Sequence, residues 1–151
     1  MRVTQSSEVA IHAVWYLATF CAGRQAQAAE VASQLQASPS YTVKILKGLA
    51  KGGVLKSKRG KLGGFSLARA PAEISLADIV VAVEKETIKF ICDHDCRDCP
   101  VEIDQCPVNE IMQEASDAAH AVLSKMSIQD LLDYQWRAPI AGNMTEKNND
   151  T

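Results

Sequence analysis

The first third of the chain has the apolar pattern of two amphipathic helices separated by a turn. From about residue 6 to residue 21, apolar side chains recur every three or four positions, which is the repeat of one helix face. Gly23 suits a position just beyond the end of that helix. The segment from about 28 to 36 repeats the pattern over a shorter length. We therefore expect a long first helix and a short second helix.

Ser38 and Pro39 mark the start of a third helix, and Gly52 and Gly53 mark its end. The Ser38 hydroxyl can accept a hydrogen bond from a backbone N–H of the first turn, and proline suits the first helical position. Polar and cationic residues share one side of this helix: Ser40, Lys44, Lys47 and Lys51. The other side is apolar, with Val43, Leu46, Leu49 and Ala50. Two short helices joined by a tight turn, the second with such a side, are typical of a helix-turn-helix that enters the major groove.

A basic β-hairpin is expected directly after the third helix. Residues 54–59 and 65–69 have the pattern of two short strands, and glycines at 60, 63 and 64 permit the positive φ angles of a tight turn. Lys58, Arg59 and Lys61 place positive charge near the tip. The glycines match neither the phosphate-binding loop nor the dinucleotide fingerprint. We therefore interpret the hairpin as the wing of a winged helix-turn-helix, which contacts the phosphate backbone.

The second half of the chain predicts three more helices. Ser75 and Asp78 have the spacing of a capped helix start, followed by an apolar stripe. A long helix is expected from about 108 to 126, and a short one from about 127 to 135. The apolar stripe of the long helix is narrow and contains small residues such as Ala115, so it favours a second helix as partner. We expect a homodimer, with packing against its own domain as the alternative.

Together these elements predict a mainly α fold with a small β-hairpin, in the α+β class. The expected organisation is a winged helix-turn-helix domain over 1–90 and a cysteine-rich loop over 91–107. A dimerisation helix with a short C-terminal helix follows over 108–136. Residues 137–151 are polar without periodicity, which is typical of a disordered tail.

Positive charge is concentrated where the helix-turn-helix and wing are expected. The formal net charge is only −2, but residues 38–69 contain eight Lys or Arg and no acid, whereas residues 70–151 contain sixteen acids and six bases. A solvated surface normally mixes both signs, so this segregation indicates a surface that meets phosphates. The candidate DNA contacts are Ser38, Ser40, Tyr41, Lys44, Lys47, Lys58, Arg59 and Lys61.

Four of the five cysteines lie within fifteen residues of acidic sequence. They are Cys92, Cys96, Cys99 and Cys106. Neighbouring carboxylates oppose formation of thiolates unless a cation occupies the site, so a metal ion or cluster is the simplest explanation. Cys96 could complete an all-thiolate set with the three cysteines spaced at intervals of seven. Cys21 lies on an apolar helix face and is expected to be a buried core thiol.

Size and composition are those of an ordinary globular protein with one modest core. The most apolar early stretch, residues 9–21, is too short to cross a bilayer and has no cleavage site, so we expect no membrane partner and a cytoplasmic location. In that compartment clustered cysteines are more often metal ligands or redox groups than structural disulfides. No nucleophile, base and orienting group form a recognisable set, so the sequence does not predict an enzyme.

The order of these parts resembles the Rrf-two family of winged-helix regulators, which includes IscR-, NsrR- and RirA-type proteins. The resemblance covers about residues 1–135 and is most specific at Met1-Arg2-Val3-Thr4, at Arg59-Gly60-Lys61-Leu62-Gly63-Gly64-Phe65-Ser66-Leu67, and at Cys92, Cys99 and Cys106. It implies a dimer on palindromic promoter DNA with an iron-sulfur cluster on those three cysteines. Two departures are the additional Cys96 and Asn109, which stands where an IscR-like histidine ligand would be sought.

The resemblance leaves the fourth ligand open. Cys96 is the first candidate, and Glu8 follows closely, since related regulators imply a ligand from the first helix of the partner subunit. His12 lies one helical turn from Glu8 and is a weaker candidate. The expected cofactor is a 2Fe-2S or 4Fe-4S cluster. Zinc is the second choice, because only Cys96 and Cys99 form a close pair of the kind that zinc sites use.

The sequence and this resemblance together predict a dimeric transcription regulator, with a repressor on a pseudo-palindromic site as the favoured interpretation, whose cluster senses iron-sulfur status, nitric oxide or redox stress. The alternatives are a zinc-bound or thiol-switch regulator of the same fold, and a small redox or electron-transfer protein. The last of these would leave the acid-free basic segment without a role.

Overall fold

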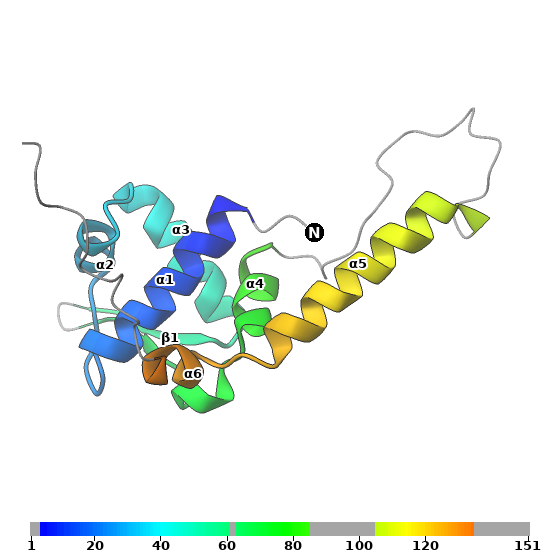
Figure 1. Ribbon diagram of the computed structural model, residues 1–151. Coiled ribbons are helices and arrows are strands. Elements are labelled where there is room, and N and C mark those ends of the chain that lie inside the picture. The colour runs from blue at the N-terminus through cyan, green and yellow to red at the C-terminus, as the bar shows by residue number, and fades with distance from the viewer. Residues whose placement is uncertain (1–3, 61–62, 85–104, 135–151) are drawn as a thin grey trace, which may run out of the picture.

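The computed structural model describes residues 4–60, 63–84 and 105–134. Six α-helices, one short 3-10 helix and one β-hairpin are found there (Figure 1). In chain order they are α1 (Gln5–Phe20), α2 (Ala28–Gln34), α3 (Pro39–Lys51), β1 (Leu55–Lys58), β2 (Gly64–Leu67), η1 (Pro71–Glu73), α4 (Leu76–Glu84), α5 (Pro107–Ser124) and α6 (Ile128–Asp133). The mainly helical fold with a two-stranded hairpin confirms the expected class.

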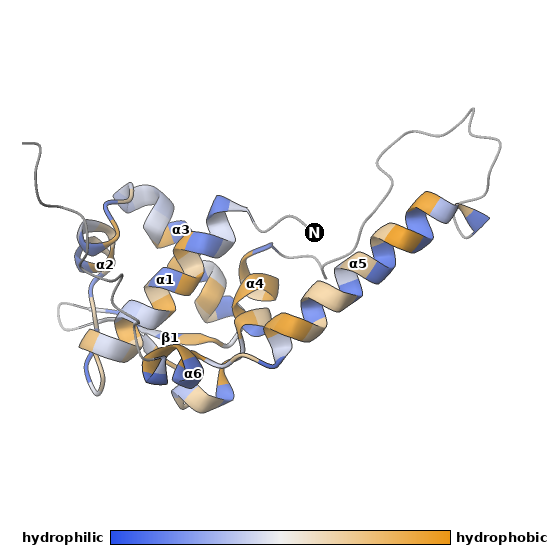
Figure 2. Ribbon diagram, in the orientation of Figure 1, coloured by the Kyte–Doolittle hydropathy of each residue, from blue (hydrophilic) through white to orange (hydrophobic). Residues whose placement is uncertain are grey.

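Helix α1 lies at the centre of the core and contacts α3, α4 and α6. Its small and branched residues Ala10, Ala13, Val14 and Leu17 are almost fully buried, because their spacing places them on one face. Apolar residues of the other elements close around that face: Val31, Leu46, Leu49, Val54, Ile74, Ile79 and Ile128. Figure 2 shows these elements with their apolar side turned inward. The core therefore fixes α3 relative to α1.

The hairpin pairs Leu55 with Leu67 and Lys58 with Gly64 in antiparallel register. Ala26, in the loop between α1 and α2, adds a single bridge to β2, with two backbone hydrogen bonds of 2.8 and 2.9 Å to Phe65. Gly64 has a φ of 144°, and a Cβ there would overlap the Ala26 carbonyl oxygen. The wing is thus joined to the start of the helix-turn-helix by backbone contacts that require glycine.

A reciprocal cap begins each of the helices α4 and α6. Ser75 accepts from the Asp78 backbone at 3.1 Å while Asp78 accepts from the Ser75 backbone at 3.2 Å, which confirms the expected capped start. Ser127 and Asp130 form the same arrangement at the start of α6. A backbone bridge joins Ser75 to Ser127, so the two helix starts lie next to each other.

Some local expectations were wrong. Ser38 is the N-cap of α3, but its hydroxyl makes no capping bond and lies 3.0 Å from the hydroxyl of Ser40. The second helix ends at Gln34 rather than at Gln36, because Gln36 adopts a φ of 50° in the turn. Ile45 and Thr42 share the buried side of α3, whereas Val43 is only half-buried.

Helix α5 extends away from the remaining helices, with its C-terminal end beside α4 (Figure 1). The expected long helix is confirmed with slightly different ends, since Met126 lies beyond its last residue. Three apolar residues of its stripe are about three-fifths exposed: Val108 at 60%, Ile111 at 64% and Val122 at 63%. Much of the stripe therefore has no cover from the described part of this chain.

A polar cluster joins α1 to α2. Arg24 donates to both carboxylate oxygens of Glu30, at 2.5 and 3.1 Å, and the Tyr16 hydroxyl donates to the same carboxylate at 3.0 Å. The Arg24 guanidinium lowers the pKa of Glu30 to about 2. Burial raises the pKa of the neighbouring Cys21 thiol. Cys21 is 3% exposed, so the expectation of a buried core thiol is confirmed.

Replacement of Glu30 should change the pH dependence of stability. The folded pKa lies below the ordinary value of 4.5, so the stabilisation is present above about pH 4.5 and is lost as pH falls towards about 2. Because the pair is partly exposed, we expect Glu30→Gln to cost at most about 1 kcal/mol at neutral pH, measured by urea unfolding. Arg24→Gln should cost a similar amount. A difference between wild type and Glu30→Gln that persists at about pH 2 would contradict this assignment.

Candidate nucleic-acid interface and cysteine segment

Helices α2 and α3, with the turn between them, form a helix-turn-helix. The buried side of α3 consists of Thr42, Ile45, Leu46 and Leu49. Thr42 is fully buried and donates its hydroxyl to the carbonyl oxygen of Ser38 at 3.0 Å, so no buried polar group is left without a partner there. This packing sets the rotation of α3 about its own axis, and the side chains of the opposite face are directed to solvent as a consequence.

The predicted contact residues of α3 occupy that solvent-facing side. Ser38, Ser40, Lys44 and Lys47 are exposed, and Tyr41 is half-buried. Tyr41 lies within hydrogen-bond distance of the Ser6 hydroxyl of α1, at 3.0 Å. The exposed serines and lysines could donate hydrogen bonds to base edges and phosphates. Tyr41, in contrast, has a partner inside the domain, which the sequence pattern did not indicate.

The wing places further cations on the surface. Lys58 ends β1 and Arg59 follows it, and both are exposed. Lys61 lies outside the described residues. Gln27 donates a hydrogen bond from its side chain to the carbonyl oxygen of Gly63, which attaches the turn of the wing to the residue that precedes α2. The cations of the wing and of α3 therefore belong to one folded unit. Residues 38–69 contain no acidic residue that would offset their charge.

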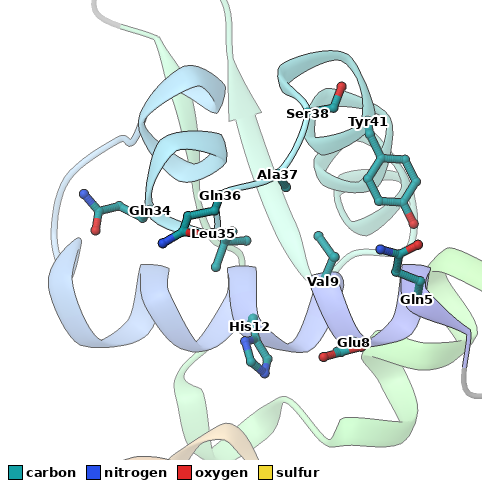
Figure 3. A pocket seen from close by; sticks show the side chains of 10 residues that line it. All are labelled: Gln5, Glu8, Val9, His12, Gln34, Leu35, Gln36, Ala37, Ser38 and Tyr41. Carbon is teal, nitrogen blue, oxygen red and sulfur yellow. The ribbon is translucent and has the colours of Figure 1, made fainter.

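A pocket of about 640 Å³ lies between α1 and the turn that precedes α3 (Figure 3). Glu8 and His12 line it from α1, one helical turn apart as expected. Ser38 and Tyr41 line it from the start of α3. Figure 3 shows Tyr41 extending from α3 towards the first turn of α1. The fold thus brings two candidate ligands near two candidate DNA contacts, and no spacing in the sequence indicated that proximity.

Of the four clustered cysteines, Cys106 is the one that the structure describes. It is the half-buried N-cap residue of α5, and its thiol makes no capping hydrogen bond. Cys92, Cys96 and Cys99 lie outside the described residues, as does the tail from residue 137. Among residues 4–60, 63–84 and 105–134, no group of three His, Cys, Asp or Glu side chains is placed to hold a metal ion. The same ranges contain no helix that is long and apolar enough to cross a bilayer.

Several characterised sequences are similar to this chain over most of its length. Protein aau3 of Rhizobium meliloti is 30% identical over 133 residues, which cover 87% of this chain and 85% of that protein. The HTH-type transcriptional regulator IscR of Photorhabdus laumondii is 26% identical over 142 residues, covering 94% of this chain and 85% of that protein. These relatives favour a regulator over a small electron carrier.

Two solved structures share the fold. CymR, described as the global cysteine regulator of B. subtilis, has a TM-score of 0.69 at 21% identity, covering 89% of this chain and 98% of that one. IscR of T. potens has a TM-score of 0.66 at 22% identity, covering 88% of this chain and 87% of that one. The sequence profile of the Rrf2 family, described as iron-dependent transcriptional regulators, matches residues 3–134. The chain therefore belongs to the Rrf2 family of DNA-binding transcriptional regulators and is not an enzyme.

Proposed function

We propose that this chain is a homodimeric transcriptional repressor whose cysteine segment, residues 92–106, holds an iron-sulfur cluster. A change in the cluster, caused by iron-sulfur status, nitric oxide or oxidants, alters the affinity of the dimer for promoter DNA. The observation that carries the proposal is the uniformly cationic, exposed surface formed by α3 and the wing.

The DNA contacts are assigned by the character of each side chain. Ser38, Ser40, Lys44 and Lys47 face solvent on α3, where a helix lying in a major groove presents its N-terminal half to the bases. Tyr41 reaches the same region from its half-buried position. Lys58, Arg59 and Lys61 belong to the wing and bind the backbone or the minor groove. Most of these contacts are cationic, so binding should weaken steeply with salt.

The uncovered stripe of α5 is assigned to the dimer interface. Val108, Ile111 and Val122 are exposed along its length, and the small Ala115 would let a second helix approach closely. Exposed apolar residues aligned on one side of a helix favour association with a second copy of that helix. A two-fold dimer presents two α3 helices, so the DNA site is a pseudo-palindrome with half-sites about one helical turn apart.

The cluster is assigned to Cys92, Cys99 and Cys106, with Cys96 or Glu8 as fourth ligand and His12 as a weaker candidate. Cys106 fits this role because its thiol lies at a helix start, is not deeply buried and makes no capping bond. Glu8 and His12 fit a ligand from the partner subunit because both are exposed on one side of α1. When bound, the cluster supplies a centre whose oxidation state or integrity changes with its surroundings.

A zinc-bound or thiol-switch regulator is the second candidate. The fold is similar to that of CymR of B. subtilis, and CymR of Staphylococcus aureus has been solved in an oxidized form. This similarity supports the second candidate. Cys92, Cys96, Cys99 and Cys106 supply enough thiols for either zinc or a disulfide, and both use the same DNA-binding surface.

Removal of two cations should abolish DNA binding without unfolding the protein. Lys44 and Arg59 are both exposed, so Lys44→Ala combined with Arg59→Ala should leave the melting temperature unchanged. In gel-shift titrations the double variant should show no binding to the promoter, because two of the cations that meet phosphates are lost. Lys125→Ala, at the C-cap of α5, is the matched control and should bind like wild type.

The cofactor is tested by purification without oxygen. We expect coloured protein that contains iron and sulfide, and colourless Cys92→Ala and Cys106→Ala variants. Cys21→Ala should keep the colour, because Cys21 is buried in the core beside Glu30 and away from the cysteine segment in sequence. Colourless wild type with stoichiometric zinc, or with a disulfide within residues 92–106, would establish the second candidate instead.

The dimer interface is tested by a matched pair of substitutions on α5. Ala115 lies on the apolar stripe, whereas Ala121 lies about a third of a turn away around the helix, and both are exposed. Ala115→Asp should yield monomers in analytical ultracentrifugation, because it places a charge in the helix contact. Ala121→Asp should leave the dimer intact. Two dimeric variants, or a monomeric wild type, would show that this stripe is not the interface.

A further inference from the structure

The last residue of α4 is bonded to the first turn of α1. One carboxylate oxygen of Glu84 accepts hydrogen bonds from the hydroxyls of Thr4 and Ser7, the latter at 2.6 Å. Ser7 is fully buried, and Thr4 is the N-cap of α1, where its hydroxyl also accepts from the Ser6 backbone at 3.1 Å. Hydrogen bonds to a charged carboxylate are stronger than those between neutral groups, and they depend on direction. The end of α4 and the start of α1 therefore move together.

The same turn of α1 is bonded to the start of α3. The Ser6 hydroxyl lies 3.0 Å from the hydroxyl of Tyr41, within the first turn of the helix that carries the candidate DNA contacts. Figure 3 shows Tyr41 directed from α3 towards this end of α1. Glu84, Thr4, Ser6 and Tyr41 consequently form one connected series of hydrogen bonds across three helices.

The last turn of α4 also touches α3 directly. A Cβ on Gly48 would lie 3.6 Å from the Ala82 carbonyl oxygen, and a Cβ on Gly52 would overlap the Cβ of Ala82. Neither glycine has a positive φ, so their small size is used for close approach and not for backbone freedom. Residues 82–84 therefore pack against α3 near its C-terminal end, and they are linked to its N-terminal end indirectly, through the first turn of α1.

We infer that residues 82–84 of α4, together with Thr4 and Ser6 of α1, transmit the state of the cysteine segment to the position of α3. This rests on the proposed function. Glu84 is eight residues before Cys92 in the chain, so the end of α4 is the described part of the winged domain that lies nearest in sequence to the clustered cysteines. Glu84, Thr4 and Ser6 are positioning residues, because none of them contacts DNA in the proposed arrangement.

Hydrogen bonds suit this task better than apolar packing would. A small rotation of the last α4 turn would take the bonds of Glu84 outside their range of distance and angle, because hydrogen bonds depend on direction as well as on distance, whereas apolar contacts do not depend on direction. Loss of those bonds would free Thr4 and Ser6, and Tyr41 with them. At the same time the close contact of Ala82 with Gly52 would tilt α3 from its other end. On this inference, α3 has one arrangement when the bonds of Glu84 are made and another when they are broken, as allosteric coupling requires.

The test compares DNA affinity in two states of the same protein. Protein purified without oxygen, and the same protein stripped of metal by a chelator, are titrated against a DNA duplex selected in vitro by the wild type. We expect the two dissociation constants of wild type to differ by at least about fivefold, the lower end of typical coupling. In Ser6→Ala and in Glu84→Ala they should agree to within about twofold, because the series is broken.

The controls separate transmission from simple loss of stability. Ser6→Thr retains a hydroxyl and should restore the wild-type ratio of the two constants. Thr19→Ala removes an exposed hydroxyl of the same helix that bonds only to the Trp15 carbonyl, and it should keep the ratio. The double variant Ser6→Ala with Glu84→Ala should show the same ratio of the two constants as each single variant. A second substitution has no additional effect when both residues belong to one route.

Two outcomes would overturn the inference. If wild type shows a difference and both single variants keep it, residues 82–84 do not transmit the state, while the proposed function stands. If wild type binds DNA equally in both states, the proposed function fails and this inference fails with it. If Glu84→Ala does not fold, Ser6→Ala still tests the inference. Ser6 is half-buried, and its replacement alone removes the contact with Tyr41.

Discussion

The burial of α1 between α3, α4 and α6 is the constraint on which the rest of the structure depends. Because Ala10, Ala13, Val14 and Leu17 are closely packed, the neighbouring helices can meet α1 in few orientations. Small residues at 10 and 13 allow a close approach that larger side chains would prevent. The orientation of α3 follows from this packing, and so does the outward direction of its cations. The same helix ends in the polar cluster around Glu30, which anchors α2.

Basic and acidic residues, which are separated along the chain, are also separated in the folded structure. The described basic residues between 44 and 59 belong to α3 and the hairpin, which are neighbours in sequence and in the structure, whereas Arg69 follows β2 and pairs with Asp78. Acidic residues in the described part belong mainly to α4, α5 and α6, for example Asp78, Glu110 and Asp130. A nearly neutral protein thereby presents one surface suited to DNA, and its acidic remainder restricts which surface approaches phosphates.

The elements could be predicted from sequence because each has a local signature. Glycine pairs, Ser75 with Asp78, and the repeat on α5 depend on neighbours within one or two turns, so their positions were found to within a few residues. The hydrogen-bond partners of individual side chains were harder to predict. The Ser38 hydroxyl was assigned to a cap, although it lies against Ser40, and Glu84 had no notable neighbours in sequence despite its bonds to Thr4 and Ser7. A pairing across about eighty residues leaves no periodic pattern in one sequence.

The core around α1 and the contacts at the end of α4 differ in how much movement they allow. The closely packed core around α1 transmits displacement but tolerates little of it, so the apolar faces of α1 and α3 stay in contact and α3 can tilt only slightly against α1. Movement is therefore expected at contacts that are made by polar groups or glycines and not by interlocking side chains. Within the described residues, the end of α4 has both, through Glu84 and through Gly48 and Gly52. On the proposed function, the junction between the helix-turn-helix and the cysteine segment is therefore the place where a modest rearrangement of that segment would change the position of α3.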